Sequence, residues 1–242
     1  RVRGKSKADI YINVMVFNRQ FLINLVEDSI AHGDTSFESD VIVKQRNSLK
    51  IYQYDFRGYY AGIHSMAAYY KHNLELLDKE VRDELFGARD IYTKVRDSAP
   101  SKYGNEATVR NSLISDGCEI EGIVENSILF RGVKVAKGAT VKNSIIMQDC
   151  VIGDNCTIDK SIIAENCTVG DGTELGVGEE APSKLSEKIY AFGLATIGED
   201  SKIPANVKIG KNTAISGITE PADYPNGELK SGEYIIKAGD SE

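Results

Sequence analysis

The sequence predicts a two-part fold: an α/β segment over residues 1–77, then a three-sided parallel β-solenoid over 107–216. One corner motif recurs four times, starting at Arg110, Glu125, Lys142 and Asp159, with spacings of 15, 17 and 17 residues (110 to 125 to 142 to 159). Aliphatic residues recur every five or six positions through the same stretch. Before residue 100 neither pattern is present, and alternating and helical segments take its place.

The first part is predicted to hold two strands and two helices. Residues 10–17 alternate and are rich in β-branched side chains, and residues 49–56 predict a second strand. Asn18 and Ser65 are typical N-caps, the second for a helix from about Met66 to Leu77. The first helix presents Phe21, Leu22, Leu25 and Val26, and the second has Tyr69, Tyr70, Asn73, Leu74 and Leu77 spaced for one buried face. Two strands are too few for the open sheet that such alternation builds, so we expect its other strands in sequence outside this chain.

The repeat predicts short strands separated by tight turns, because a period of six suits neither a 3.6-residue helix nor a long alternating strand. Three such units make one triangular coil, and stacked coils bury their aliphatic residues in a common core. The pattern resembles the hexapeptide-repeat family, whose fold is the left-handed parallel β-helix. It is interrupted over 176–196, which we expect to be an insertion. Residues 78–106 are expected to form a linker, and 217–242 a C-terminal cap or tail.

Four cysteines lie in the repeat and are interpreted as packing residues: Cys118, Cys150, Cys156 and Cys167. Each follows an aliphatic residue at the fourth position, where Thr173 stands in another copy, so the position selects for small size. No CxxC pair exists, and all three histidines (His32, His64 and His72) precede the coils. A metal or redox role for the cysteines is therefore disfavoured.

Composition excludes several classes of partner. The formal net charge is −7, which argues against general nucleic-acid binding, since that needs clustered Lys and Arg. No apolar run approaches the length of a membrane span, and no export signal is recognisable at the start. We therefore expect no nucleic acid and no membrane among the partners, and a cytoplasmic protein.

Residues 58–77 resemble a signature of the ADP-glucose pyrophosphorylase (glucose-1-phosphate adenylyltransferase) family. The stretch begins Gly-Tyr-Tyr-Ala-Gly-Ile-His-Ser and continues into a helix with Tyr-Lys-His-Asn-Leu-Glu-Leu-Leu. In the family, Gly-Tyr-Trp-x-Asp-Val-Gly-Thr precedes a helix ending Tyr-x-x-Asn-x-x-Leu-Leu. Two unrelated patterns, signature and hexapeptide repeat, occur in the family's order, so the resemblance implies that residues 1–77 are the C-terminal part of a nucleotidyltransferase domain.

The family's metal-binding Asp is replaced here. That Asp helps to hold the Mg²⁺ that bridges the substrate phosphates, and its position is occupied by Gly62. The resemblance therefore implies a GlgD-type, non-catalytic subunit of glycogen biosynthesis that joins a catalytic ADP-glucose pyrophosphorylase subunit and regulates it allosterically. We assign no catalytic, cofactor-binding or metal residue to this chain, and expect Mg²⁺ only if the full-length protein is active. A homo- or hetero-oligomer, tetramer-like in its assembly, is expected.

Three other functions are compared with this one by the residues that each requires. An active glucose-1-phosphate adenylyltransferase, making ADP-glucose from ATP and glucose 1-phosphate, is the main alternative, since several carboxylates share the metal in such sites. A pure assembly subunit is a third possibility. A hexapeptide acyltransferase would need a coil histidine as general base, and none is present in the coils. Asp40 is either a structural residue at a helix start or a relic of the family's site.

Overall fold

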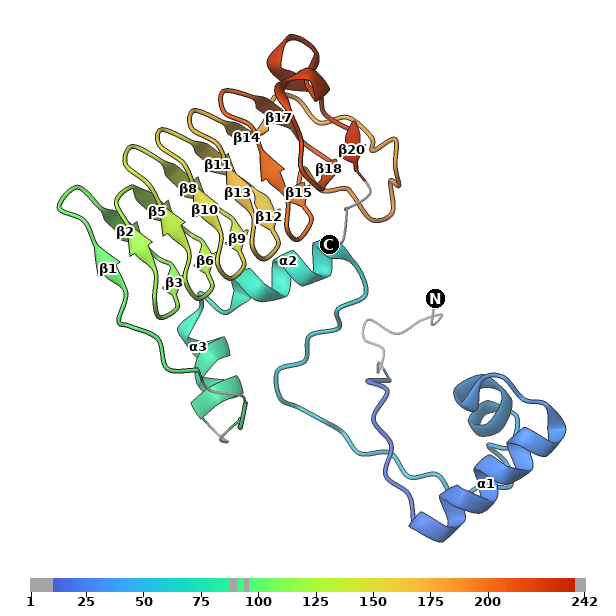
Figure 1. Cartoon of the computed structure of the whole chain (residues 1–242). Helices are drawn as coiled ribbons and strands as arrows, with labels where there is room; N and C mark the ends of the chain where they lie inside the picture. The colour runs from blue at the N-terminus through green and yellow to red at the C-terminus, as the bar shows by residue number, and fades with distance from the viewer. Residues whose placement is uncertain (1–10, 88–90, 94–95, 238–242) are drawn as a thin grey trace, which may run out of the picture. The chain divides into compact units, whose positions relative to one another are not determined.

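The computed structural model describes residues 11–87, 91–93 and 96–237, in two units with a division between Gly58 and Tyr59 (Figure 1). The first unit contains α1 (Arg19–His32) and a π-helical turn (Phe37–Val43). The second contains α2 (Met66–Glu75), α3 (Lys79–Arg82), a further π-helical turn (Asp83–Gly87) and all the strands. None of the helices in the described part is both long and apolar enough to cross a membrane.

The first unit is a small helical cluster. Asn18 caps α1 as predicted, its Oδ1 accepting hydrogen bonds from the backbone N–H groups of Gln20 and Phe21. The ring of Phe17 contacts those of Phe21 and Phe37, with centroids 6.5 and 5.8 Å apart. Leu25 of α1 and Val41 of the π-helical turn are buried.

The two strands predicted in this unit are not formed, and that prediction is wrong for the described residues. Segments 11–17 and 49–56 have no regular strand structure. Most of their apolar side chains face solvent, with Val16 95 % exposed and Tyr52 and Tyr54 each 87 % exposed. A strand needs a neighbour to satisfy its backbone N–H and C=O groups, and none of the described residues supplies one here.

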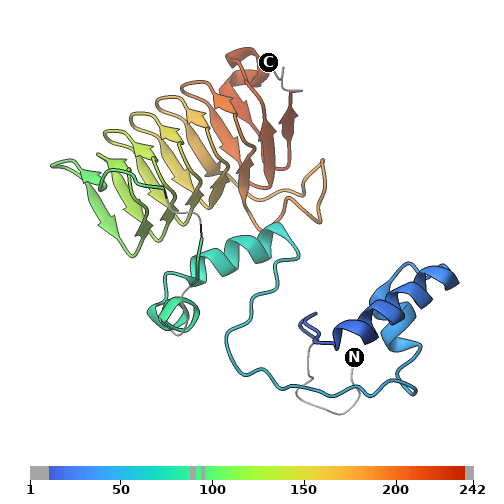
Figure 2. The same ribbon diagram turned by 60° about the horizontal axis from the view of Figure 1, so that its bottom comes forward.

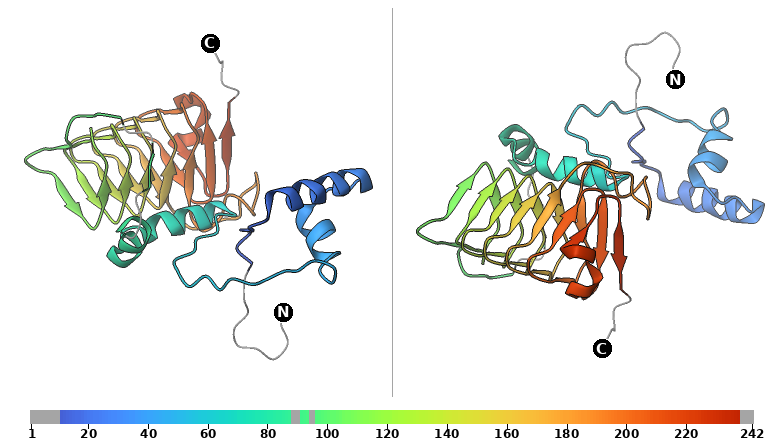
Figure 3. Two further views of the ribbon diagram at one scale, coloured as in Figure 1. Left: turned by 90° about the horizontal axis from the view of Figure 1, so that it is seen from below. Right: turned by 90° about the horizontal axis from the view of Figure 1, so that it is seen from above.

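The second unit is the predicted left-handed parallel β-helix, built from three parallel sheets that form its sides (Figures 1 and 3). The first sheet comprises β1 (Lys102–Tyr103), β4 (Glu119–Ile120), β7 (Lys134–Val135), β10 (Val151–Ile152), β13 (Thr168–Val169) and β16 (Lys202–Ile203). The second comprises β2 (Thr108–Arg110), β5 (Ile123–Glu125), β8 (Thr140–Lys142), β11 (Thr157–Asp159), β14 (Glu174–Val177), β17 (Lys208–Gly210) and β19 (Glu228–Leu229). The third comprises β3 (Leu113–Ile114), β6 (Ile128–Leu129), β9 (Ile145–Ile146), β12 (Ser161–Ile163), β15 (Ala195–Ile197), β18 (Thr213–Ser216) and β20 (Tyr234–Ile236).

The register places equivalent aliphatic residues above one another, as the repeat predicts. In the second sheet Val141, Ile158 and Leu175 are successive partners, and all three are fully buried. Residues on the outer side of the same strands, such as Thr157, stay exposed. Every strand except β1, whose two residues are exposed, therefore contributes at least one side chain to a continuous core that runs along the axis of the β-helix.

The predicted packing role of the cysteines is confirmed. All four are free and buried at the interior corners. Each thiol also donates a hydrogen bond to a carbonyl of the next coil, as from Cys156 Sγ to Gly170 O at 3.1 Å. Thr173, at an equivalent corner, donates to Pro204 O in the same way. Burial raises the pKa values of the Cys118 and Cys156 thiols, which favours their neutral form.

A ladder of buried serines joins the corners that precede the third sheet. Ser144 Oγ donates to Lys142 O at 2.6 Å and accepts from the backbone N–H of Ser161 in the next coil at 3.1 Å. Ser127 makes the same pair of bonds one coil earlier. The residue before each of these serines has a left-handed backbone, which suits Asn126 and Asn143.

Replacing Ser144 by alanine should lower the free energy of unfolding by about 1–3 kcal/mol, because the N–H of Ser161 loses its acceptor in a buried corner. Urea denaturation followed by circular dichroism measures the loss. Ser115→Ala, at an exposed position, is the matched control and should change the stability by less than about 0.5 kcal/mol. Equal effects from the two variants would show that the serine ladder contributes nothing to stability.

Helix α2 covers the outer face of the third sheet (Figures 1 and 2). Ser65 caps it as predicted, and its side chains Met66, Tyr69, Tyr70 and Leu74 pack against Ile145, Ile162 and Leu194. Tyr70 Oη donates to Asn143 O at 2.5 Å, and burial raises the pKa of this phenol to about 12. The central strands β9 and β12 of the third sheet are thus buried on both faces, and helix and coils form one structure.

The expected linker, insertion and C-terminal tail each differ in part from their predicted bounds or structure. The first coil strand, β1, lies within the expected linker, and α3 precedes it. Residues 178–194 loop out of the β-helix, as the interruption in the repeat predicts. The expected tail forms a last coil through β19 and β20, with Tyr224 buried against the core.

Candidate functional site

The segment with the family-like signature runs from Gly58 into the N-cap of α2 at Ser65. It has no regular secondary structure, and hydrogen bonds of Tyr59 hold its beginning. The backbone N–H of Tyr59 donates to Glu84 Oε1 at 2.6 Å, and Tyr59 Oη donates to Glu75 Oε2 at 2.6 Å. His72 Nδ1 lies 2.7 Å from the same Glu75 oxygen. The side chains of Tyr59 and His72 are therefore held on the Glu75 carboxylate, and Glu84 fixes the backbone of Tyr59.

These contacts change the acidity of the groups involved. Burial, followed by the bond to Glu75, raises the pKa of Tyr59 to about 12. The hydrogen bonds from Tyr59 and His72 hold the pKa of the Glu75 carboxyl below its usual value. The ionised form of Glu75 is thus favoured, and its carboxylate is hydrogen-bonded to Tyr59 and His72. Sequence reasoning missed this network, although the three-residue spacing of His72 and Glu75 places them on one helix face.

Gly62 lies in the middle of this segment, against two larger side chains. A Cβ built on Gly62 would lie 2.7 Å from His64 Nε2 and 3.1 Å from Tyr60 Oη. His64 stands where the family signature has glycine. The side-chain space of the family's Asp is therefore occupied here by an imidazole and a phenol.

Next to Gly62 is a cavity of about 320 Å³ with largely aromatic and aliphatic walls. Tyr60, Ile63 and Phe86 are among its lining residues, none of which is a carboxylate. Mg²⁺ prefers several oxygen ligands in octahedral geometry. In the described part of the chain no three side chains of His, Cys, Asp or Glu gather as a metal-binding group. The residues around Gly62 therefore do not fit a Mg²⁺ site.

The other residues singled out from the sequence lie elsewhere. Asp40 Oδ2 accepts from the backbone N–H groups of Thr35 and Ser36, and its other oxygen lies 3.0 Å from Lys44 Nζ. The bond to Lys44, then those to the two amides, hold the pKa of this carboxyl below its usual value. The structure thus gives Asp40 the helix-start role. His32, His64 and His72 all precede the first coil, so no described coil residue serves an acyltransferase as a histidine base.

Comparisons with known proteins agree with the signature and the repeat. Residues 98–197 match the family model described as "GlmU-like, C-terminal hexapeptide". A glucose-1-phosphate adenylyltransferase of Lachnospira eligens is 51 % identical over 81 % of this chain and 46 % of its own length. One from Thermotoga neapolitana is 44 % identical over 93 % of this chain and 54 % of its own length. The chain is homologous to proteins named glucose-1-phosphate adenylyltransferase.

The chain spans about half the length of these glucose-1-phosphate adenylyltransferase relatives. Among solved structures, the acetyltransferase domain of PglB from Neisseria gonorrhoeae FA1090 aligns with 55 % of this chain and 56 % of its own, at 18 % identity and a TM-score of 0.27. That likeness is too low to bear on function.

Proposed function

We propose that this chain is part of a regulatory or assembly subunit of ADP-glucose pyrophosphorylase in glycogen biosynthesis, and that the subunit is catalytically degenerate. Two observations support the pathway: the homology to glucose-1-phosphate adenylyltransferases and the signature that leads into α2. A GlgD-type subunit, related to the catalytic chain but lacking its metal site, accounts for both.

One observation carries the degenerate part of the proposal, the surroundings of Gly62. The position offers no ligand, and His64 and Tyr60 occupy the space into which a side chain there would extend. Substitution of a metal ligand by glycine, together with a bulky histidine two residues later, is a paired change. It favours loss of the metal site over a shift of the ligand to a neighbouring residue.

The partners follow from this role. The subunit is proposed to join a catalytic ADP-glucose pyrophosphorylase subunit in the cytoplasm, within a homo- or hetero-oligomer of tetrameric type. Regulation then takes the form of a coupling free energy between effector binding and catalysis. The outer faces of the first two sheets carry mixed charges, such as the ion pair of Lys134 and Glu119 at 3.0 Å, and suit a subunit contact rather than nucleic acid.

An active glucose-1-phosphate adenylyltransferase is the second candidate. The observation that favours it is the 51 % identity to a relative that carries this name. In that case other carboxylates of the full-length protein hold the Mg²⁺, and Gly62 is tolerated.

Restoring the signature tests the proposal. Gly62→Asp returns the ligand but leaves His64 against it, whereas Gly62→Asp with His64→Gly returns the ligand and clears its space. We expect Mg²⁺-dependent pyrophosphate release from ATP and glucose 1-phosphate to rise in the order wild type, single variant, double variant. The rise should reach about a hundredfold in the double variant, since metal charge stabilisation is worth several kcal/mol.

His64→Gly alone is the control, because it frees the space without adding a ligand. Its activity should equal that of the wild type. A wild-type protein that already turns over at the rate of an active relative, and gains nothing from the double variant, would favour the second candidate.

A further inference from the structure

Two of the four buried cysteines are stacked in successive coils of the β-helix. Val151 of β10 pairs with Thr168 of β13, and the backbone N–H of Val151 donates to Cys167 O at 2.8 Å. Cys150 and Cys167, one residue earlier in each coil, therefore occupy the same interior corner. Paired strands lie about 4.8 Å apart, and a disulfide needs Cα atoms about 4.4–6.8 Å apart. The backbone thus already holds the two residues at a separation that a disulfide can span.

The other two cysteines have no cysteine in an adjacent coil. By the same register Cys118 stacks on Val133, and Cys156 lies between Ala139 and Thr173. Both are buried and, like the pair, donate a hydrogen bond to a backbone carbonyl. They are internal references for any reaction that requires two adjacent thiols.

The two stacked thiols also affect each other's acidity. Hydrogen bonding between them holds the pKa of the Cys167 thiol below its usual value and raises the pKa of the Cys150 thiol. At Cys118 and Cys156, by contrast, burial raises the pKa. Because the thiolate is the reactive form of cysteine, Cys167 is the most easily activated of the four.

Both stacked cysteines lie directly behind surface turns. Cys150 follows the exposed residue Asp149, and Cys167 follows the exposed residue Asn166. Opening of one turn is therefore enough to bring a thiol to solvent, and such local openings require less free energy than unfolding of the whole β-helix. Hydrogen peroxide is only slightly larger than water and needs no wider opening.

We propose that Cys150 and Cys167 are a peroxide-sensitive pair that closes into a disulfide between two coils. The Cys167 thiolate attacks one oxygen of hydrogen peroxide, the O–O bond breaks, hydroxide leaves, and Cys167 becomes a sulfenic acid. The Cys150 sulfur then attacks Cys167 Sγ, so that an S–S bond forms, the S–OH bond breaks, and the departing hydroxide takes up the Cys150 proton as water. Two thiols are oxidised and one peroxide is reduced.

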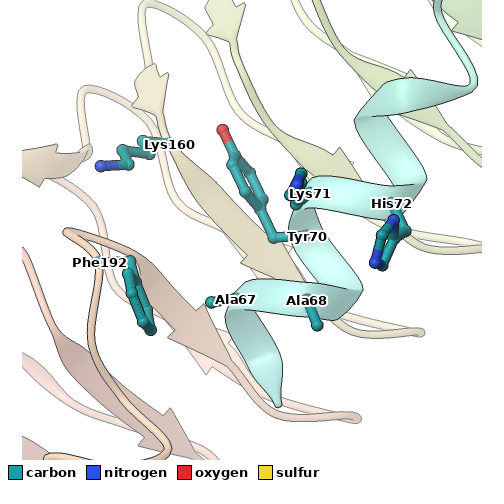
Figure 4. A pocket seen from close by; sticks show the side chains of 7 residues that line it. All are labelled: Ala67, Ala68, Tyr70, Lys71, His72, Lys160 and Phe192. Atoms are coloured by element: carbon teal, nitrogen blue, oxygen red, sulfur yellow. The ribbon is translucent and has the colours of Figure 1, made fainter. Parts of the chain in front are cut away.

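The disulfide fixes the part of the β-helix on which α2 rests. Cys150 follows β9 and Cys167 follows β12, and these two strands pack against α2. Tyr70 extends from α2 toward the coils (Figure 4), and its Oη donates to Asn143 O just before β9. Oxidation would therefore link the coils beneath this helix. The proposal does not depend on whether the protein is catalytic.

Thiol counting after peroxide treatment tests the proposal on the complete protein, at peroxide concentrations that leave its circular dichroism unchanged. In denaturant, the reduced protein should show four thiols and the oxidised protein two (4 − 2). Peptide mass mapping should find the peptides of Cys150 and Cys167 joined, with two hydrogen atoms lost. This pair should lose its thiols at least about tenfold faster than Cys118 and Cys156, because its second step is intramolecular. Dithiothreitol should restore all four thiols.

Cys167→Ser removes the pair, and serine suits this corner because Ser201 occupies it in the next coil. The variant should form no disulfide. Cys118→Ser is the matched control, which leaves the pair intact and should close as the wild type does. Oxidation should raise the urea midpoint of unfolding for the wild type and Cys118→Ser, since the cross-link restricts the unfolded chain, and should not raise it for Cys167→Ser.

Three results would overturn the proposal. The first is a wild-type protein that keeps all four thiols under peroxide. The second is equal loss of thiol from all four cysteines without a joined peptide, which is the behaviour of a globally unfolded chain. The third is a disulfide between two protein molecules, seen as a dimer in non-reducing electrophoresis.

Discussion

Replacing Gly176 by alanine should cost the β-helix about 2–5 kcal/mol of stability. Gly176 is buried in β14 with φ 77°, and a Cβ there would lie 2.0 Å from the backbone O of Asp159 in the preceding coil. That oxygen also accepts from Ser161 Oγ at 2.8 Å, so it is not free to move aside. The left-handed conformation accounts for about 1–2 kcal/mol and overpacking for about 1–3 kcal/mol.

Gly178→Ala is the matched control two residues later. Gly178 has nearly the same φ, 78°, but is exposed, and the nearest atom to its Cβ position is Ser231 Oγ at 3.9 Å. Only the conformational cost of about 1–2 kcal/mol should remain. Urea denaturation followed by circular dichroism compares the two variants. Equal losses would mean that the coils are not packed as closely at Gly176 as the structure has them.

The β-helix was largely predictable from the sequence because its strands and corners repeat at a short, regular spacing. Each coil repeats a strand and a corner. The regular sequence spacing of Val141, Ile158 and Leu175 was therefore enough to predict that they share one core position. The burial of the cysteines followed from the size limit at the same corners. A further signal was available: the corner motif carries two consecutive aliphatic residues, such as Ile145 and Ile146, which is typical of a strand buried on both faces.

The first unit shows where local patterns fail. Residues 11–17 and 49–56 alternate as strands do, but a strand requires hydrogen-bond partners from elsewhere in a sheet. The helices needed no such partner, because Asn18 and Ser65 cap them from within the chain. Local capping could be predicted from sequence, whereas sheet formation could not.

At the candidate sites, too, the sequence identified single residues but not the contacts between distant segments. Gly62 was found only through resemblance, and the space taken by His64 and Tyr60 needed coordinates. The four cysteines were recognised as corner residues, but the stacking of Cys150 on Cys167 became apparent only from the register of β10 and β13. Their separation of 17 residues (167 − 150), one period of the repeat, was a visible signal of that contact.

The largest functional effect that we expect is the loss of catalysis by this protein alone. The proposed role rests on Gly62, which offers no carboxylate, and on a neighbouring cavity that no carboxylate lines; without a metal ligand here, Mg²⁺ would not stabilise the transition-state charge from this position. Several kcal/mol of lost stabilisation correspond to a rate at least about a hundredfold below that of a catalytic sibling.

The most direct measurement is pyrophosphate release from ATP and glucose 1-phosphate by the full-length protein, alone and mixed with its catalytic sibling. We predict a rate at background level for the protein alone, and a changed rate or changed effector response of the sibling in the mixture. The sibling assayed alone at the same concentration is the reference. Robust release by this protein alone, with a mixture that gives only the sum of the two rates, would contradict the role of a regulatory subunit.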